Sequence, residues 1–228
     1  MTNSNSLLTW LNKTLWHQQP LAVQTFDRGE IIFAPGQSAE QIYFLLEGTV
    51  KLSTDKRSDP KISLILLPEQ SLFGVLSLME QKTERFYQAI AFTPVRLVSL
   101  TRTQWQQALQ ESPEFGLLMT SQLSRRLLHA NKILETLRQR DLITRLVWYL
   151  LLLADDFGIE TESGILINLQ LSHSALAELI GSSRPTVTHL LQSLRYEQMI
   201  GIAGHKITLF QPESLSQRFS GEQQKLLV

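Results

Sequence analysis

The chain has 228 residues, of which 43 % are hydrophobic, with 21 lysines and arginines against 21 aspartates and glutamates, and it has no cysteine. This length accommodates one large domain or two smaller ones, and the apolar content is too high for a disordered chain. The missing cysteines exclude disulfides, thiolate metal ligands, cysteine-ligated iron–sulfur clusters and cysteine nucleophiles, while the zero net charge gives no indication of a nucleic-acid partner.

Short β-type runs dominate the first hundred residues. Before them, leucines at helical spacing predict an amphipathic helix that ends at about Gln18. Between Ala22 and Leu100 the runs are separated by turn residues and no helix intervenes, which predicts an antiparallel sandwich or jelly-roll barrel. The runs cover residues 22–26, 30–33, 42–53, 62–67, 86–92 and 95–100.

A long helix is predicted next. Thr101 and Gln104 have the spacing of a capping box, and a longer helix is expected from about Pro113 to about Arg140. Within it, five apolar residues alternate steps of four and three, as in a coiled coil: Leu123, Leu127, Ala130, Leu134 and Leu137. This stripe fits either a helix lying on its own domain's core or a dimer interface. The charged residues that flank it favour the dimer.

The second half of the chain is predicted to be mostly helical. Asp141 can cap a helix with a wide apolar face, and a loop or hairpin is expected over residues 158–169. Two short helices joined at Gly181 follow, and then a hairpin that turns at residues 203–205. The polar tail from Ser214 is expected to be loosely ordered.

No stretch of the chain has the pattern of a membrane helix. The most apolar run, residues 147–154, is 8 residues long, against about 20 in a membrane span. The N-terminal residues also lack the pattern of a signal peptide. We therefore expect a cytoplasmic protein with no membrane partner.

Residues 171–191 have the spacing of a helix-turn-helix motif. Ala175 is small where two crossing helices touch, and Gly181 permits the left-handed conformation of the turn. Ser182 or Ser183 can cap the second helix, and Pro185 falls in its first turn. The exposed face then presents side chains that suit a DNA groove: Arg184, Thr186, Thr188, His189, Gln192 and Arg195. An ordinary helical hairpin is the alternative, and the β-hairpin that follows favours a DNA-binding unit.

This order of elements resembles the CRP/FNR family of bacterial transcription regulators, and especially its nitrogen-regulating branch. The matching stretches include IYFLL at 42–46, FGVLSL at 73–78, RFY at 85–87, AFTPV at 91–95 and the helix-turn-helix. The resemblance implies an α+β fold with a β-roll or jelly-roll sensor domain over 1–112, a dimerisation helix over 113–140 and a winged helix-turn-helix over 141–228. It also implies a homodimer that binds double-stranded DNA at a palindromic GTA…TAC site, responds to 2-oxoglutarate, and contacts RNA polymerase if it is an activator.

The effector site of the family carries over unevenly. The resemblance places seven residues at the ligand: Phe73, Gly74, Val75, Leu76, Arg85, Arg126 and Asn131. It implies that residues 73–76 bind the ligand through backbone amides and that Arg85 binds one of its carboxylates. Arg126 is implied to reach the pocket of the other protomer. Asn131, followed by Lys132, replaces a glutamate of the branch, which implies a retuned affinity or another effector.

Other ligands of the family fit this chain less well. Cyclic-AMP-binding members have a glutamate after the pocket glycine and a serine after the arginine, where this chain has Val75 and Phe86. Haem-binding members need a histidine in the sensor barrel, and residues 20–128 contain none. Iron–sulfur members need cysteines. We therefore expect no cyclic AMP, haem, iron–sulfur cluster or other cofactor.

The recognition helix departs from the family pattern at two positions. Pro185 replaces the usual contact residue and His189 replaces an arginine, so an altered half-site or weaker binding is expected. Ser172 and His173 fall where family members touch phosphates. The predicted DNA-binding residues are therefore Ser172, His173, Ser183, Arg184, Pro185, Thr186, Thr188 and His189.

Two other classes of function stay open. A cupin-type enzyme would need a metal held by a cluster of histidine and carboxylate ligands inside the barrel. The predicted barrel has no histidine, so we expect neither enzyme activity nor a metal site. Residues 142–228 contain six basic and eight acidic side chains, which keeps open a regulator that acts by protein contact, as a mixed dimer or without an effector.

Overall fold

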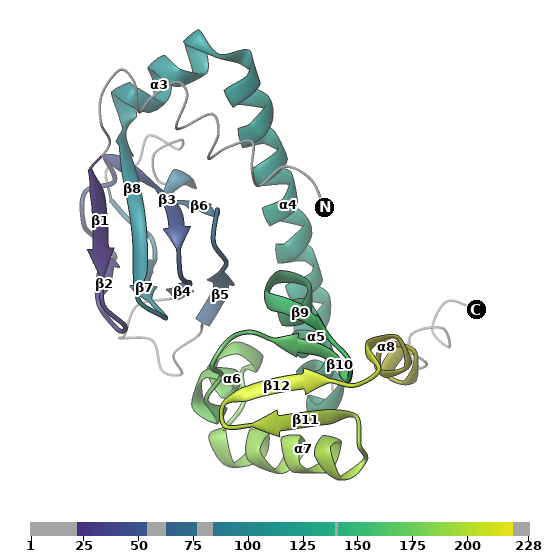
Figure 1. The fold of residues 1–228 in the computed structure, drawn as a ribbon. Coiled ribbons are helices and arrows are strands. Elements are labelled where there is room, and N and C mark those ends of the chain that lie inside the picture. The colour runs from purple at the N-terminus through teal and green to yellow at the C-terminus, as the bar shows by residue number, and fades with distance from the viewer. Residues whose placement is uncertain (1–21, 54–62, 77–83, 140, 221–228) are drawn as a thin grey trace. The chain divides into compact units, whose positions relative to one another are not determined.

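The computed structural model of the chain describes residues 22–53, 63–76, 84–139 and 141–220 (Figure 1). The chain divides into two compact units between Leu128 and His129, and each is described by itself. The helix expected before Gln18 lies outside the described residues.

The first unit contains two antiparallel four-stranded sheets, which confirms the predicted β architecture. One sheet has the order β1 (Val23–Phe26), β8 (Val95–Thr101), β3 (Gln41–Glu47) and β6 (Leu72–Phe73). The other has the order β2 (Ile31–Phe33), β7 (Gln88–Ala91), β4 (Val50–Ser53) and β5 (Ser63–Leu67). Figure 1 shows the two sheets facing each other. The sequence did not predict β6, because two residues are too short to show an alternation.

Side chains of the first sheet alternate between two cores. Tyr43 and Leu45 of β3 belong to the cluster between the sheets. Ile42 and Phe44 lie on the other face, in a cluster that contains residues of α3 (Arg102–Glu111) and α4 (Pro113–Leu137). The capping box is confirmed, because Thr101 Oγ1 accepts from Gln104 N at 3.2 Å and Gln104 Oε1 accepts from Thr101 N at 2.9 Å.

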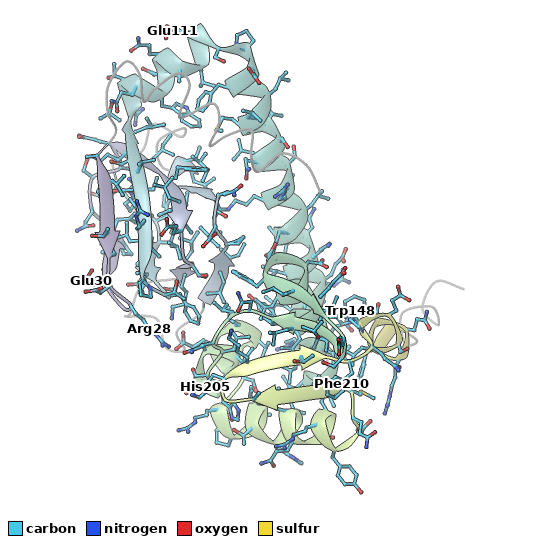
Figure 2. All side chains as sticks on the ribbon, in the orientation of Figure 1. Arg28, Glu30, Glu111, Trp148, His205 and Phe210 are labelled. Atoms are coloured by element: carbon cyan, nitrogen blue, oxygen red, sulfur yellow. The ribbon has the colours of Figure 1, made fainter. Side chains whose placement is uncertain are left out.

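The second unit contains helices around a four-stranded antiparallel sheet. The sheet order is β11 (Ile200–Ala203), β12 (Lys206–Leu209), β10 (Gly164–Ile167) and β9 (Gly158–Thr161). The helices are α5 (Leu142–Phe157), α6 (His173–Ile180), α7 (Arg184–Tyr196) and α8 (Pro212–Ser220). The side-chain view in Figure 2 marks His205 at the turn between β11 and β12, which is the predicted wing.

The expectation of a loosely ordered tail from Ser214 was wrong for residues 214–220, and residues 221–228 lie outside the described residues. Helix α8 covers residues 214–220 and packs against α5, with Leu215 only 3 % exposed. Leu215 and the partly buried Phe219 have the i, i+4 spacing of a helix, but two apolar residues are too few to indicate a helix among polar neighbours in the sequence. None of the helices in the described ranges combines the length and the apolar character needed to cross a membrane.

Candidate functional site

The two helices of the predicted helix-turn-helix are α6 and α7. Ser172 caps α6 by accepting from Ala175 N at 3.1 Å, and Ser183 caps α7 by accepting from Thr186 N at 3.3 Å. Gly181 ends α6 with φ 65° and ψ 47°, the left-handed conformation that the turn requires. Local sequence signals therefore fix both the turn and the start of the second helix.

Helix α7 buries one face and exposes the other. Val187, Leu191 and Leu194 are buried against the rest of the unit. A shallow depression on the opposite side is lined by five residues of the predicted DNA-contacting face: Arg184, Pro185, Thr188, His189 and Gln192. The structure thus gathers these side chains on one surface, as a helix that reads a groove requires.

His173 and Thr188 join α6 to α7. His173 Nδ1 lies 2.7 Å from Thr188 Oγ1, and that hydroxyl donates to the Arg184 carbonyl at 2.9 Å. Thr186 and Ser183 pair their hydroxyls at 2.8 Å within the cap. With Ser172, which caps α6, all four of the predicted DNA-contacting hydroxyls are therefore already engaged within the module.

Sequence reasoning gave no role to Arg145 of α5. Its Nη1 donates to the Ile180 carbonyl at 3.0 Å, and its Nη2 donates to the Gln139 carbonyl at 2.8 Å. Arg145 thereby ties the end of α6 to the residues that follow α4. Its partners are backbone groups, and no pattern of side chains in the sequence could have indicated them.

The predicted effector segment ends β6 in the first unit. Phe73 is fully buried and Val75 is 6 % exposed, whereas Leu76 is 57 % exposed. Gly74 has φ +84°, and a Cβ atom there would lie 2.8 Å from Arg85 Nη1. Only glycine therefore fits between Arg85 and the backbone at this point.

Arg85 is a buried cation without an acidic partner among the described residues. It is 4 % exposed, and its Nη1 and Nη2 donate to the carbonyls of Gly74 at 2.9 Å and Gln41 at 2.5 Å. Its Cζ lies 4.4 Å from the centre of the Phe33 ring and 5.4 Å from that of Tyr43. Nε is buried without a partner. Burial lowers the pKa of Arg85, and the nearby tyrosine hydroxyls offset part of that fall.

Arg126 approaches the same segment from α4. Its Nη1 donates to the Leu72 carbonyl at 2.5 Å, its Nη2 is buried without a partner, and burial lowers its pKa. Within one chain, Arg85 and Arg126 thus both bind carbonyls of residues 72–74. The implied reach of Arg126 into a partner's pocket stays a prediction.

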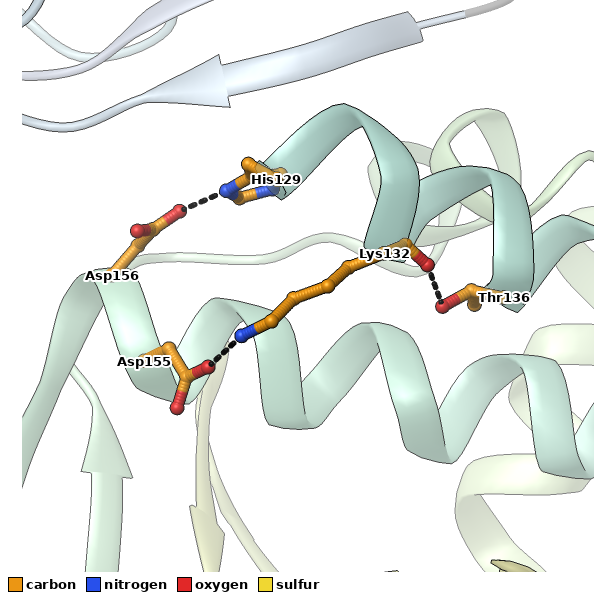
Figure 3. Close-up of polar contacts among 5 residues, drawn as sticks. All are labelled: His129, Lys132, Thr136, Asp155 and Asp156. Carbon is orange, nitrogen blue, oxygen red and sulfur yellow. Dashed lines mark hydrogen bonds and ion pairs between the residues drawn. The ribbon is translucent and has the colours of Figure 1, made fainter. Parts of the chain in front are cut away.

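Asn131 and Lys132, which follow Arg126 along α4, belong to the second unit. Asn131 is exposed. Lys132 pairs with Asp155 of α5 at 3.2 Å, and His129 pairs with Asp156 at 3.2 Å, as Figure 3 shows. Lys132 thus has a carboxylate partner on the surface of the second unit, and its effect on an effector site stays a prediction.

The apolar stripe of α4 is exposed. Its five residues, Leu123, Leu127, Ala130, Leu134 and Leu137, all lie on the surface of the single chain. The residues through which α4 joins the core are Phe115 and Met119, which precede the stripe. The stripe thus does not lie on the chain's own core.

The described residues also contain no group of three or more His, Asp or Glu side chains placed to hold a metal ion.

Comparisons with known proteins agree with this architecture. A cyclic nucleotide-binding domain family matches residues 23–112, and a Crp-like helix-turn-helix domain family matches residues 144–218. The chain is 48 % identical over 221 residues to the Global nitrogen regulator of Synechococcus elongatus, covering 96 % of this chain and 100 % of that protein. It is 50 % identical over 202 residues to the Global nitrogen regulator of a Nostoc species, covering 88 % and 91 %.

A solved CRP/FNR-family transcriptional regulator from Thermus thermophilus superposes with a TM-score of 0.70 at 28 % identity, covering 88 % of this chain and 98 % of that one. The sensor-type sheets and the helix-turn-helix therefore define a CRP-like DNA-binding transcription regulator, not an enzyme. Within that class, the chain belongs to the family of the global nitrogen regulators.

Proposed function

We propose that this regulator is a homodimer that binds a palindromic GTA…TAC-type site and is controlled by a small dicarboxylate, 2-oxoglutarate, in the balance between nitrogen and carbon. The observation that carries the effector proposal is the pair of guanidinium groups at residues 72–74. Arg85 and Arg126 each have a buried nitrogen without a partner, and neither pairs with an acidic side chain of the described residues.

A buried cation without a counter-charge is costly, and a dicarboxylate could compensate both. Carbonyl dipoles satisfy part of each guanidinium but leave its net charge unpaired. Arginine binds carboxylates through two parallel hydrogen bonds, which suits a small dianion better than a neutral ligand. The backbone amides of Phe73, Gly74, Val75 and Leu76 are proposed to complete this site, with Asn131 in place of the acid found in the branch.

The DNA proposal rests on the face of α7 that surrounds the shallow depression. Arg184 is exposed at the start of the helix and can donate two hydrogen bonds to guanine. Ser172, His173, Ser183, Pro185, Thr186, Thr188 and His189 are proposed to complete the contact with bases and phosphates. A dimer formed along the α4 stripe would present two such helices, which explains why a palindromic site is expected.

Calorimetric titration with 2-oxoglutarate tests the effector site. Arg85→Lys keeps the positive charge but removes the planar guanidinium that can donate two parallel hydrogen bonds to a carboxylate. We expect it to weaken 2-oxoglutarate binding at least tenfold. Arg96→Lys is the matched control, because Arg96 lies in the same unit, is half exposed and pairs with Glu47. Equal affinities for the parent and Arg85→Lys would contradict the site, and a loss in Arg96→Lys as well would indicate only a general effect of charge.

One observation favours a second candidate, a regulator that needs no effector. Both terminal nitrogens of Arg85 already bind protein carbonyls, so the segment is satisfied in part without a ligand. This candidate predicts the same DNA affinity with and without 2-oxoglutarate, and no heat of binding in the titration. A mixed dimer acting by protein contact predicts instead that the pure protein shifts no duplex from a genomic pool.

A further inference from the structure

A chain of two hydrogen bonds links the helices of the DNA-binding module. His173 is the first residue of α6, and its Nδ1 lies 2.7 Å from Thr188 Oγ1 on α7. The same Thr188 hydroxyl donates to the carbonyl of Arg184 at 2.9 Å. Thr188 also lines the depression on the DNA-contacting face.

The number of hydrogens available fixes the direction of both bonds. A hydroxyl has a single hydrogen, and a carbonyl oxygen can only accept, so that hydrogen is used between Thr188 and Arg184. Thr188 Oγ1 must therefore accept from His173, and the imidazole carries its hydrogen on Nδ1. In the neutral ring, Nε2 is then left with a lone pair and no hydrogen.

This tautomer decides what His173 can offer to DNA. Phosphate oxygens only accept hydrogen bonds, so a lone pair on Nε2 repels them. The start of α6 otherwise suits a phosphate, because backbone amides and the helix dipole favour an anion there. Protonation would give Nε2 a hydrogen while leaving the bond from Nδ1 to Thr188 intact.

We propose that Thr188 sets the tautomer of His173, so that His173 binds a DNA phosphate only as an imidazolium and DNA binding takes up one proton. This inference rests on the proposed DNA contact of the module and deepens it. His173 and Thr188 thereby act as a pair: Thr188 is a positioning residue, and His173 is the group that meets the DNA backbone.

Other charged and titratable groups lie on the elements that form this module. Arg184 and His189 line the same depression on α7, and Arg145 of α5 binds the carbonyl at the end of α6. The carbonyl of His205, at the wing turn, accepts from the backbone of Leu171 just before α6. Glu178 lies on α6 itself. Of these, only His189 and His205 are histidines, so they are the groups that the experiment must control.

The first test measures DNA affinity at pH 8 and pH 6 by fluorescence anisotropy, using duplexes that the protein selects from a genomic pool. One linked proton changes the dissociation constant by up to about tenfold per pH unit. We expect the parent to bind at least fivefold tighter at pH 6. His173→Gln has an amide that donates a hydrogen bond at either pH, so it should lose this pH step, the gain in affinity from pH 8 to pH 6. The control variants His189→Gln and His205→Gln should keep the pH step.

Thr188→Val tests whether Thr188 sets the tautomer of His173 or only supports the structure of the module. Valine keeps the shape but accepts no hydrogen bond, so the neutral His173 can move its hydrogen to Nε2 and donate to phosphate. We expect Thr188→Val to bind as tightly at pH 8 as at pH 6. A variant that simply damaged the module would bind weakly at both pH values and keep the pH step.

Nitrogen-15 NMR of histidine-labelled protein checks the tautomer without DNA. We expect the hydrogen of neutral His173 on Nδ1 in the parent and a shift toward Nε2 in Thr188→Val. An Nε2-protonated ring in the parent, or an unchanged pH step in His173→Gln, would overturn this inference alone. Failure to bind any duplex at either pH would overturn the proposed function as well.

Discussion

The α4 stripe allows the dimer to be tested with two neighbouring leucines. Leu127 belongs to the stripe and Leu128 does not, yet they are 65 % and 64 % exposed in the single chain. Position 128 falls on the solvated back of the coiled-coil pattern. Replacing each by alanine therefore removes nearly the same exposed side chain from two different faces of one helix.

The expected magnitude follows from the exposed fraction of Leu127. Burying a whole leucine contributes about 1.5–3 kcal/mol, so burying its exposed share of 65 % contributes about 1–2 kcal/mol. Twofold symmetry counts this contribution twice, which gives about 2–4 kcal/mol for the dimer. Because alanine keeps the β-carbon, we expect Leu127→Ala to raise the dimer dissociation constant by between about tenfold and several hundredfold.

Sedimentation velocity over a range of concentrations measures this constant directly. Leu128→Ala should stay within about threefold of the parent, because a solvated leucine contributes little to association. Equal effects of the two variants would refute the assignment of the interface to the stripe. A monomeric parent at all concentrations would refute the dimer itself.

Three further predictions concern single contacts. Ser183→Ala removes the cap of α7 and should lower the unfolding free energy by about 1 kcal/mol, measured by urea denaturation, while weakening DNA binding; an unchanged midpoint would show that the cap is not formed. Arg145→Met removes two hydrogen bonds from a charged donor, each contributing about 1.5–3 kcal/mol, so the variant should melt at a lower temperature than the parent; a variant as stable as the parent would contradict the link between α6 and Gln139. Gly74→Ala forces a Cβ to within 2.8 Å of Arg85 Nη1 at a positive φ and should abolish effector binding and reduce stability, whereas Gly116→Ala, which meets nothing within 4 Å, should do neither; equal behaviour of the two would refute the close approach.

Local signals in the sequence predicted most of the architecture. Caps such as Thr101, Asp141 and Ser183 act within three residues, so the sequence alone indicates where their helices begin. The β-type run at residues 42–53 likewise predicted strands, and β3 and β4 lie within it. Helix α8 was missed because its two apolar residues, Leu215 and Phe219, are too few to establish a helical period among polar neighbours.

The functional contacts were less predictable, because their partners are far apart in sequence and are often backbone atoms. Arg85 binds the Gln41 carbonyl 44 residues away, and Arg145 binds the Ile180 carbonyl 35 residues away. Sequence reasoning selected Arg85, His173 and Thr188 as ligand-contacting residues. It could not show that all three already have partners within the chain.

The central claim is that a small dicarboxylate at Arg85 and Arg126 controls DNA binding by α7. Its most direct test is the anisotropy of a labelled GTA…TAC duplex titrated with protein, with and without 2-oxoglutarate. Coupling between two sites amounts to about 1–3 kcal/mol, so we expect the dissociation constant to change by at least about fivefold in the parent. We expect no change in Arg85→Lys and no specific binding in Arg184→Ala. Specific binding by the parent that is identical with and without 2-oxoglutarate would contradict the claim.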